Sequence, residues 1–187
     1  MLKTLLIACS FILFFTIGVT AADLSQITKI EGFVKIQDTL NANTNKPFEC
    51  ANYVAASKSC SAISTSKIDG DSLIAANRIL IISEPQIEMQ IKARFDLVHG
   101  LACSSPSAWN IVVVGDTVTP ELEKLAIDAL RNSLEKFGKL CIGYFEVDGQ
   151  LQTVNFSAET GKRIEDIAST NITFWETAPT LRAAEQT

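Results

Sequence analysis

The chain has 187 residues, of which 16 are Lys or Arg, 21 are Asp or Glu and 47% are hydrophobic. An acidic chain without a basic cluster repels phosphate backbones, so nucleic acid is excluded as a partner. The same charge balance argues against binding to anionic lipid surfaces by charge. The length suits one domain that buries a sizeable core.

The N-terminus has the three parts of a secretory signal peptide. Lys3 provides a basic start, residues 5–19 form an apolar block without charge, and residues 20–22 are small. An uncleaved membrane anchor is the alternative, but a spanning helix needs about 20 apolar residues and this block is shorter. We therefore predict a signal peptide over residues 1–22, with cleavage after Ala21 or after Ala22.

Removal of the signal peptide leaves residues 23–187 as a single domain in a secreted or periplasmic location, without a stable membrane anchor. The signal contains one base, Lys3, and no acid, so 15 bases and 21 acids remain and the net charge becomes −6. Mild acidity of this kind is ordinary for a soluble surface and implies no particular partner.

Four cysteines remain after Cys9 leaves with the signal. An even number of cysteines in an exported domain predicts disulfides, and four cysteines permit three pairings. The preferred pairing joins Cys50 to Cys60 and Cys103 to Cys141. No two cysteines have the C-x-x-C spacing typical of redox and zinc sites, so we predict a structural role.

The first part of the mature chain gives mixed signals. Residues 27–37 are apolar and β-branched with loose alternation, which predicts a strand. Residues 38–47 are rich in Asn and Thr and predict a polar loop. Residues 48–66 contain the close cysteine pair and many Ala and Ser residues, and the pattern leaves a short helix and irregular structure both open.

A long hairpin is the clearest β signal. Residues 73–82 form an apolar run that ends at the turn cluster 83–85. From Ile87 to Leu97 apolar and polar residues then alternate, which is typical of a strand with one buried and one wet face. This period of two places Phe95 inside and Arg94 in solvent.

The second half predicts a strand, a helix and a further hairpin. Thr119 and Pro120 have the residue types of an N-cap and a first turn, and apolar residues follow at helical spacing to a stop at Gly138. Asp148-Gly149 is a strong hairpin signal. The elements expected are a strand buried on both faces over 109–114, a helix from Thr119 to Phe137, strands over 141–147, 150–156 and 171–175, a short helix over 162–168, and a frayed tail from about 177.

These elements together predict an α+β fold. The expected architecture is an antiparallel-rich sheet with one long helix packed on a face and stapled by disulfides. The sequence contains no internal repeat and no linker that would divide the domain.

Catalytic constellations are weak in this sequence. His99 is the only histidine, and with Asp96, Ser104 and Ser105 nearby a triad can be imagined. The spacing is too local to form a triad by itself, and no G-x-S-x-G turn exposes a nucleophile. We therefore assign no catalytic residue, and a hydrolase that uses His99 is kept as an alternative.

Metal and cofactor motifs are equally weak. Asp69-Gly-Asp71 resembles the start of a calcium loop but lacks the further acidic positions, so a tight turn is preferred. Val114-Gly-Asp116 lies where a ligand can meet a strand end, but no Gly-rich phosphate loop or Lys follows it. We predict no metal and no cofactor.

Two further features leave alternatives open. Asn155 and Asn171 match the N-glycosylation pattern, and a strand position such as Asn155 would carry a glycan only on a wet face. The long amphipathic strand over 87–97 is expected to pack on an ordinary core, with a groove for a small apolar ligand as the alternative.

The function expected from these observations is that of an exported, non-enzymatic binding or accessory protein. Its partner would be a protein or a small apolar ligand. The alternatives are the small hydrolase that uses His99 and a protein inhibitor of an extracytoplasmic enzyme, acting through a loop at 38–47 or 61–72.

Overall fold

The structure is a computed structural model that describes residues 22–183 of the chain. The predicted signal peptide therefore lies outside the described residues except for Ala22, and residues 184–187 lie outside them as well. Within residues 22–183, no helix combines the length and the apolar character needed to cross a membrane.

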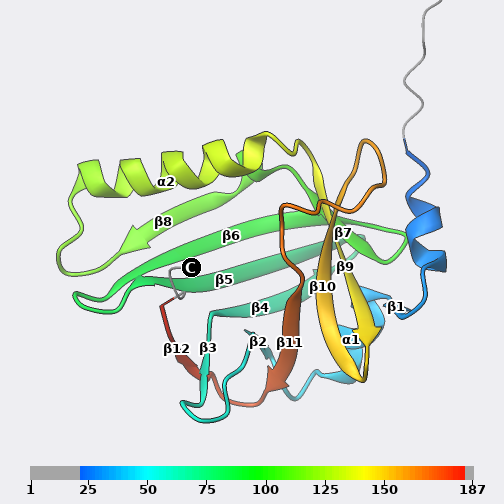
Figure 1. Cartoon of the computed structure of the whole chain (residues 1–187), viewed down its shortest axis with the longest axis horizontal. Helices are drawn as coiled ribbons and strands as arrows, with labels where there is room; N and C mark the ends of the chain where they lie inside the picture. The colour runs from blue at the N-terminus through cyan, green and yellow to red at the C-terminus, as the bar shows by residue number, and fades with distance from the viewer. Residues whose placement is uncertain (1–21, 184–187) are drawn as a thin grey trace, which may run out of the picture.

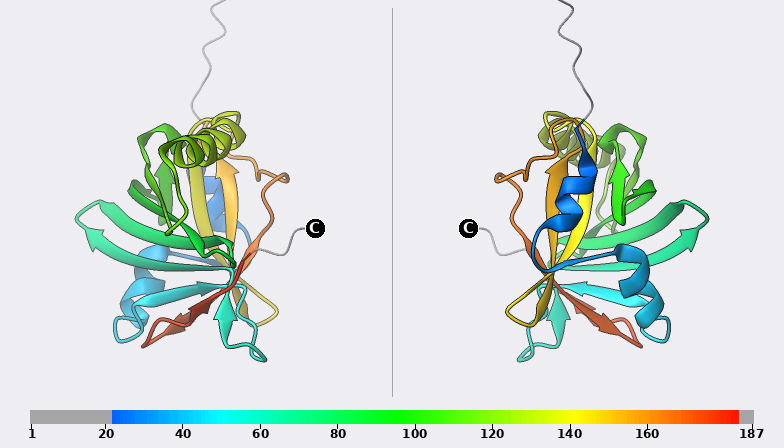
Figure 2. Two further views of the ribbon diagram at one scale, coloured as in Figure 1. Left: turned by 90° about the vertical axis from the view of Figure 1, so that its left-hand side faces the viewer. Right: turned by 90° about the vertical axis from the view of Figure 1, so that its right-hand side faces the viewer.

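Eight antiparallel strands close into a barrel (Figures 1 and 2). Each strand pairs with the next barrel strand along the chain, and the last pairs back with the first, which is the topology of an up-and-down barrel. In order around the barrel the strands are β2 (Phe48–Ala51), β4 (Ala62–Asp69), β5 (Ser72–Ile82), β6 (Ile87–Val98), β7 (Leu101–Ser104), β9 (Leu140–Val147), β10 (Gln150–Ser157) and β11 (Thr170–Trp175).

Short strands and helices decorate this barrel. β1 pairs with β9, β8 pairs with β6, and β3 and β12 form a separate parallel pair. The strands are β1 (Phe33–Val34), β3 (Ser59–Cys60), β8 (Asn110–Val114) and β12 (Thr180–Leu181). The α-helices are α1 (Ile36–Ala42) and α2 (Pro120–Glu135), and the 3-10 helices are η1 (Leu24–Lys29) and η2 (Pro106–Ala108).

The predicted α+β fold is wrong, because the sheet closes on itself and the protein is mostly β. Helix α2 covers only a small part of the sheet: no residue of α2 is buried, and Leu125 is 68% exposed. Its contacts are with the inner face of β6 and β8 beyond the barrel, where Ala126, Ile127 and Leu130 pack on Ile111 and its neighbours. Hydrophobic periodicity detected the strands but carries no information on which strands meet to close the barrel.

Both predicted hairpins are present. In β6 the side chains of Ile91, Ala93 and Phe95 are buried and those of Lys92 and Arg94 are exposed, as the period of two requires. Strands β9 and β10 are joined at Asp148 and Gly149, whose φ angles of 52° and 73° are the positive pair that a type I′ turn needs.

The strand predicted over 27–37 is wrong. This segment starts within η1, continues through β1 and enters α1. Asp23 begins η1 by accepting a hydrogen bond from the Ser25 amide, and Gly32 turns the chain at a φ of 80°. The apolar residues of the segment are buried in two different places, because Ile27 packs outside the barrel and Ile36 packs inside it.

The remaining element predictions are confirmed only in part. Residues 38–42 of the predicted polar loop belong to α1, and residues 48–66, left open between a short helix and irregular structure, contain β2, β3 and the start of β4. The strand at 109–114 is buried on one face only, since Val112 and Val114 are more than one-third exposed at this edge strand. Helix α2 starts as predicted, with the Thr119 hydroxyl accepting from the Leu122 amide. Residues 162–168 form turns instead of a helix, and β12 lies in the segment for which a frayed tail was expected.

A tightly packed cluster covers the outside of β7, β9 and β10, and we call it the outer core. Helix η1 covers this cluster (Figure 2, right). Its seven buried residues are Ile27, Leu101, Cys103, Cys141, Phe145, Val154 and Phe156. The rings of Phe33 and Phe156 lie 5.6 and 5.8 Å from that of Phe145. The barrel therefore has a core on its outer surface in addition to its interior.

Candidate functional site: a cavity inside the barrel

The barrel interior contains a cavity of about 270 Å³. Most barrel strands contribute inward-facing side chains to it, and α1 adds one more. The lining residues are Ile36, Glu49, Ala51, Ala62, Ser64, Ser66, Leu73, Ala75, Asn77, Ile91, Ala93, Phe95, Ala102, Trp109, Ile142, Tyr144, Thr153, Asn155, Thr170 and Ile172.

Small side chains on β2, β4 and β5 create this space, and we call these three strands the open wall. Directly opposed residues on neighbouring strands are both small, as in the pairs Ala51 with Ala62 and Ser66 with Ala75. Opposed residues lie about 5 Å apart, so a row of Ala and Ser leaves the space beside it unfilled. Ala75 is in turn opposed by Ala93 of β6.

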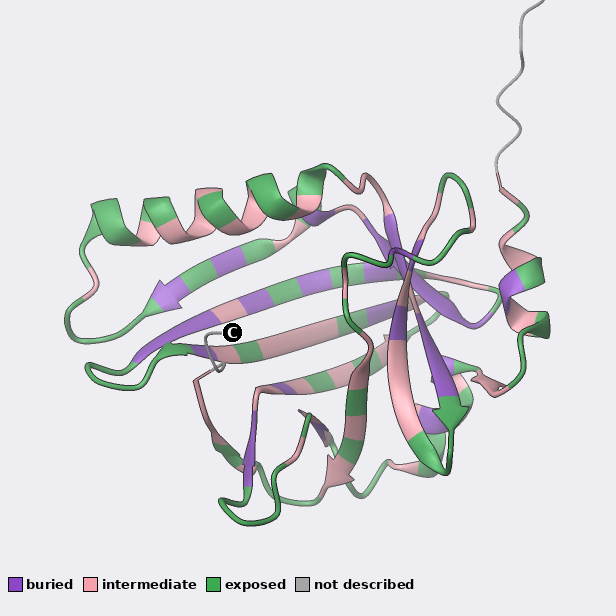
Figure 3. Cartoon of the chain, in the orientation of Figure 1, coloured by how far each residue is buried: buried purple, intermediate pink, exposed green. Residues whose placement is uncertain are grey.

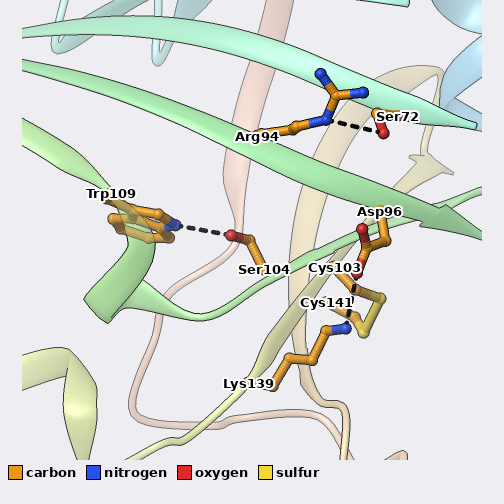
Figure 4. A network of polar contacts seen from close by, with 8 residues as sticks. All are labelled: Ser72, Arg94, Asp96, Cys103, Ser104, Trp109, Lys139 and Cys141. Carbon is orange, nitrogen blue, oxygen red and sulfur yellow. Dashed lines mark hydrogen bonds and ion pairs between the residues drawn. A yellow bond between two sulfur atoms is a disulfide. The ribbon is translucent and has the colours of Figure 1, made fainter. Parts of the chain in front are cut away.

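Two large aromatic side chains, Phe95 of β6 and Trp109 before β8, also line the cavity. Trp109 lies with its ring centroid 6.2 Å from that of Phe95. The indole nitrogen of Trp109 donates to the Ser104 hydroxyl at 3.2 Å, and Arg131 of α2 donates to the Trp109 carbonyl at 3.3 Å. These contacts fix the indole ring at the cavity edge (Figure 4).

Helix α1 closes one end of the cavity. Its first residue, Ile36, is 1% exposed and packs with Leu73, Phe95 and Tyr144. The Ile36 amide donates to the Gly100 carbonyl at 3.1 Å.

The barrel strands around the cavity differ in how far their residues are buried (Figure 3). Strand β7 is fully buried, whereas β5 and β11 are largely of intermediate exposure.

A buried carboxylate lies in the cavity wall. Glu49 is 6% exposed, and one of its oxygens, Oε2, accepts a hydrogen bond from the Tyr144 hydroxyl across the barrel. Burial raises the pKa of Tyr144 well above its ordinary value, and the nearby charge and hydrogen bond of Glu49 raise it further. Tyr144 therefore keeps its proton and acts as the donor.

The second oxygen of Glu49 has no partner among the described residues. Neither Glu49 Oε1 nor the side-chain oxygen of Asn77 forms a hydrogen bond there, although both are buried. Glu49 is directly opposed by Ser64, and Ser64 by Asn77, so the three side chains form one row across the open wall. None of the residues that line the cavity is Lys, Arg or His.

The residues imagined as a catalytic triad are not brought together. His99 is exposed in the turn between β6 and β7, at a φ of 54°. The Asp96 carboxylate pairs with Lys139 at 2.9 Å, and the Ser104 hydroxyl accepts from Trp109 (Figure 4). Asp96 and Ser104 therefore have partners other than His99.

The candidate calcium turn is used structurally. Asp69 pairs with Arg94 at 3.1 Å, and the Asp71 carbonyl accepts from the Leu97 amide. In the part of the chain that the structure describes, no group of three or more His, Cys, Asp or Glu residues is placed to hold a metal ion. Gly115 and Asp116 lie in a polar surface pocket beside the ion pair of Arg78 and Glu88.

Both predicted disulfides form. Cys50 joins Cys60 with a Cα separation of 5.5 Å, and Cys103 joins Cys141 with a Cα separation of 4.0 Å. Cys103 and Cys141 are directly opposed on β7 and β9, inside the outer core. Paired disulfides are typical of proteins from oxidising, extracytoplasmic environments.

The two glycosylation motifs differ in placement. Asn155 lines the cavity, so it faces the barrel interior and not the wet face that a glycan would need. Asn171 is exposed on β11, and its backbone amide donates to the side-chain oxygen of Asn52 at 3.2 Å.

Sequence reasoning missed Glu49 and Tyr144. The available signal was Glu49 itself, an acid at the second position of the short run Phe48–Ala51. Because neighbouring side chains of a strand point to opposite faces, Glu49 and Cys50 lie on different faces of β2. In the long strand β6, Ile91, Ala93 and Phe95 belong to buried hydrophobic clusters and also line the cavity. Comparison with protein-family models, curated proteins and solved structures finds no match to this chain.

Proposed function

We propose that this protein is a non-enzymatic binding protein of the secreted or periplasmic space that encloses one small amphipathic molecule in its barrel. The cavity of about 270 Å³ is the observation that carries the proposal. Barrels of eight strands are wide enough either to be filled by side chains or to hold one small ligand. Here the Ala and Ser residues of the open wall favour the second case.

The size and lining of the cavity limit the ligand. Its volume lies just below the roughly 300–1,000 Å³ of pockets for drug-sized molecules, so the ligand is smaller than these. Most of the lining is apolar. Its only acidic side chain lies in the polar row Glu49, Ser64 and Asn77, and Thr153, Asn155 and Thr170 add neutral polar groups on β10 and β11. A lining of this kind fits a molecule with an apolar body and a polar end at Glu49.

The hydrolase alternative lacks support from the arrangement of His99. A general base must lie within hydrogen-bond reach of its nucleophile or reach it through one water. His99 is exposed in a turn and Ser104 is bonded to Trp109, so the proposal leaves catalysis aside.

Native mass spectrometry of the protein recovered from its own compartment tests the proposal directly. We expect an extra non-covalent mass that disappears under denaturing conditions. Saturation-transfer NMR with 2-phenylethanol as a neutral amphipathic probe provides the second test, with transfer expected from the cavity residues.

A matched pair of variants assigns that signal to the cavity. Ala75→Phe fills the space, and Ala76→Phe places the same side chain beside exposed Lys92 on the outer face of β5. We expect the first variant to abolish saturation transfer and the second to retain it. Equal signals in both variants, or no bound molecule in either experiment, would contradict the proposal.

A further inference from the structure

We infer that the ligand carries a protonated amine and that Glu49 binds it. This inference rests on the proposed function and specifies the chemistry of the ligand's polar end. The carboxylate, its neighbours in the polar row and the absence of a basic side chain from the lining carry the argument.

Glu49 is arranged to receive a hydrogen-bond donor from the cavity. The Tyr144 hydroxyl occupies Oε2, while Oε1 is buried without a partner. A carboxylate accepts through both of its oxygens, and leaving one unpaired in a desolvated site is costly. A donor from a bound molecule removes this cost.

A cationic donor fits the site better than a neutral one. No Lys, Arg or His lines the cavity, so the negative charge of Glu49 is not balanced by a neighbouring side chain there. A buried charge is tolerated when it is paired and hydrogen-bonded. A neutral hydroxyl would supply one hydrogen bond but no charge, and an anionic group would be repelled.

The polar row matches the number of donors on a primary ammonium group. Such a group has three N–H donors and no acceptor. Glu49 Oε1, the Asn77 side-chain oxygen and the Ser64 hydroxyl between them are acceptors on adjacent strands, and the first two have no protein partner. These acceptors select an amine over a more methylated cation with fewer N–H groups.

The rest of the cavity sets the size of the apolar body. Phe95 and Trp109 contribute aromatic rings to the lining, and Ile91 adds an aliphatic surface. A single ring with a short aminoalkyl chain therefore suits the available volume of about 270 Å³.

Three probes of the same shape test the inference. 2-Phenylethylamine, 2-phenylethanol and phenylacetate share an apolar body and carry a cationic, a neutral and an anionic end at pH 7. We expect calorimetric and NMR titrations to rank them amine, alcohol and acid, with the amine binding about 10- to 100-fold more tightly than the alcohol, since charged hydrogen bonds are the stronger ones.

Glu49→Gln is the decisive variant because it keeps the shape of the side chain and an oxygen to accept from Tyr144. Loss of the charge is expected to weaken amine binding about 10- to 100-fold and to leave alcohol binding nearly unchanged. Glu146→Gln is the matched control, since Glu146 is an exposed acid on β9. This control should bind all three probes as the wild type does.

The outcomes separate the inference from the proposed function. Equal binding of amine and alcohol, or amine binding that survives Glu49→Gln, overturns the amine assignment and leaves the cavity as a binding site. Absence of binding for all three probes, together with no retained molecule in the native mass spectrum, overturns the proposed function itself. The wild-type series decides the question even if Glu49→Gln fails to fold.

Discussion

The open wall and the opposite side of the barrel are both built from antiparallel strands, but the open wall presents more small side chains to the interior. The open wall, β2, β4 and β5, presents Ala and Ser to the interior. The opposite side, β7, β9 and β10, carries the outer core on its other face, and we call these strands the packed wall. Figure 3 shows this contrast as buried residues gathered on β7 and β9 and intermediate ones on β4 and β5.

This difference indicates where the barrel obtains its stability. A closed barrel that leaves its interior partly empty gives up packing there, since an unfilled cavity loses both burial and dispersion contacts. The outer core supplies compensating contacts on the opposite face of the packed wall, where Phe145 lies between Phe33 and Phe156. The contacts that compensate for the cavity therefore lie on the outer face of the packed wall, whereas the cavity lies in the interior of the barrel.

The largest expected effect tests the inward alternation of β6, the strand between the two walls. Phe95→Asp buries a charge in place of an aromatic ring and should lower the free energy of unfolding by about 4 kcal/mol or more. Arg94→Asp removes only the exposed pair with Asp69 and should cost about 1 kcal/mol or less. Chemical denaturation measures both, and equal losses would contradict the inward placement of Phe95.

The two disulfides compare the walls directly. Cys103–Cys141 in the packed wall closes 38 residues and Cys50–Cys60 beside the open wall closes 10. Loop-closure entropy predicts losses of about 4 and about 3 kcal/mol when each pair is replaced by Ala. Urea denaturation of the two double variants gives the order of these losses, and the reverse order would mean that closure entropy does not dominate.

Reduction of both disulfides by dithiothreitol should lower the melting temperature of the wild type.

Adding a small group to each wall sharpens the comparison. A methyl group at Gly143 in the packed wall would approach Leu101 Cδ2 to 2.9 Å and Phe145 Cε2 to 3.0 Å, so Gly143→Ala should cost about 1–2 kcal/mol. Ala75→Val in the open wall enters the cavity and should change stability by less than about 1 kcal/mol. Thermal and urea unfolding provide the values. A larger loss for Ala75→Val would show that the open wall has no free space.

The smallest effect concerns the ion pair between Arg78 of β5, in the open wall, and Glu88 of the neighbouring strand β6. Hydrogen bonds from Arg78 lower the pKa of Glu88, and its bond with Gln90 and the charge of Arg78 lower it further against the opposing effect of burial. Because the folded-state pKa is depressed, this stabilisation is present above the usual carboxyl pKa and disappears as pH falls through the lowered value.

Glu88→Gln should therefore lower the free energy of unfolding by about 1 kcal/mol at pH 7 and flatten its dependence on pH in the acid range. Urea denaturation over a pH series measures this dependence. Asp128→Asn provides the comparison, since Asp128 pairs with Lys124 on the exposed surface of α2. An unchanged acid profile in Glu88→Gln would mean that the pair contributes nothing.

Local sequence patterns predicted the elements whose signals are short-range. The alternation in β6, the Asp148-Gly149 turn and the Thr119 cap each depend on residues within a few positions. The strand prediction at 27–37 is wrong for the same reason. Loose alternation of apolar residues is compatible with a strand, but also with two apolar side chains that are buried on different sides of the barrel wall. Ile27 and Ile36 are both buried in the structure, as expected for apolar side chains, but they belong to different hydrophobic clusters.

The candidate site was less predictable than the fold elements. Glu49 and Tyr144 are 95 residues apart in the sequence and meet only because β9 faces β2 across the barrel. A single acid in a short apolar strand carries no indication of its partner. By contrast, the triad hypothesis at His99 depended only on polar residues close to it in the sequence. His99 lies in a turn, and its neighbour Asp96 pairs with Lys139 instead.

The sequence alone determined the positions of the hairpins, the start of α2 and the inward face of β6. It left three pairings of the four cysteines possible, and the structure selects the preferred one. Only the tertiary structure decided that β11 returns to β2 and that β7 meets β9, which turns a sheet into a closed barrel. These pairings join segments far apart in the chain, and backbone hydrogen bonds between them depend little on side-chain identity. The cavity follows from that closure, since small residues enclose space only when another wall faces them.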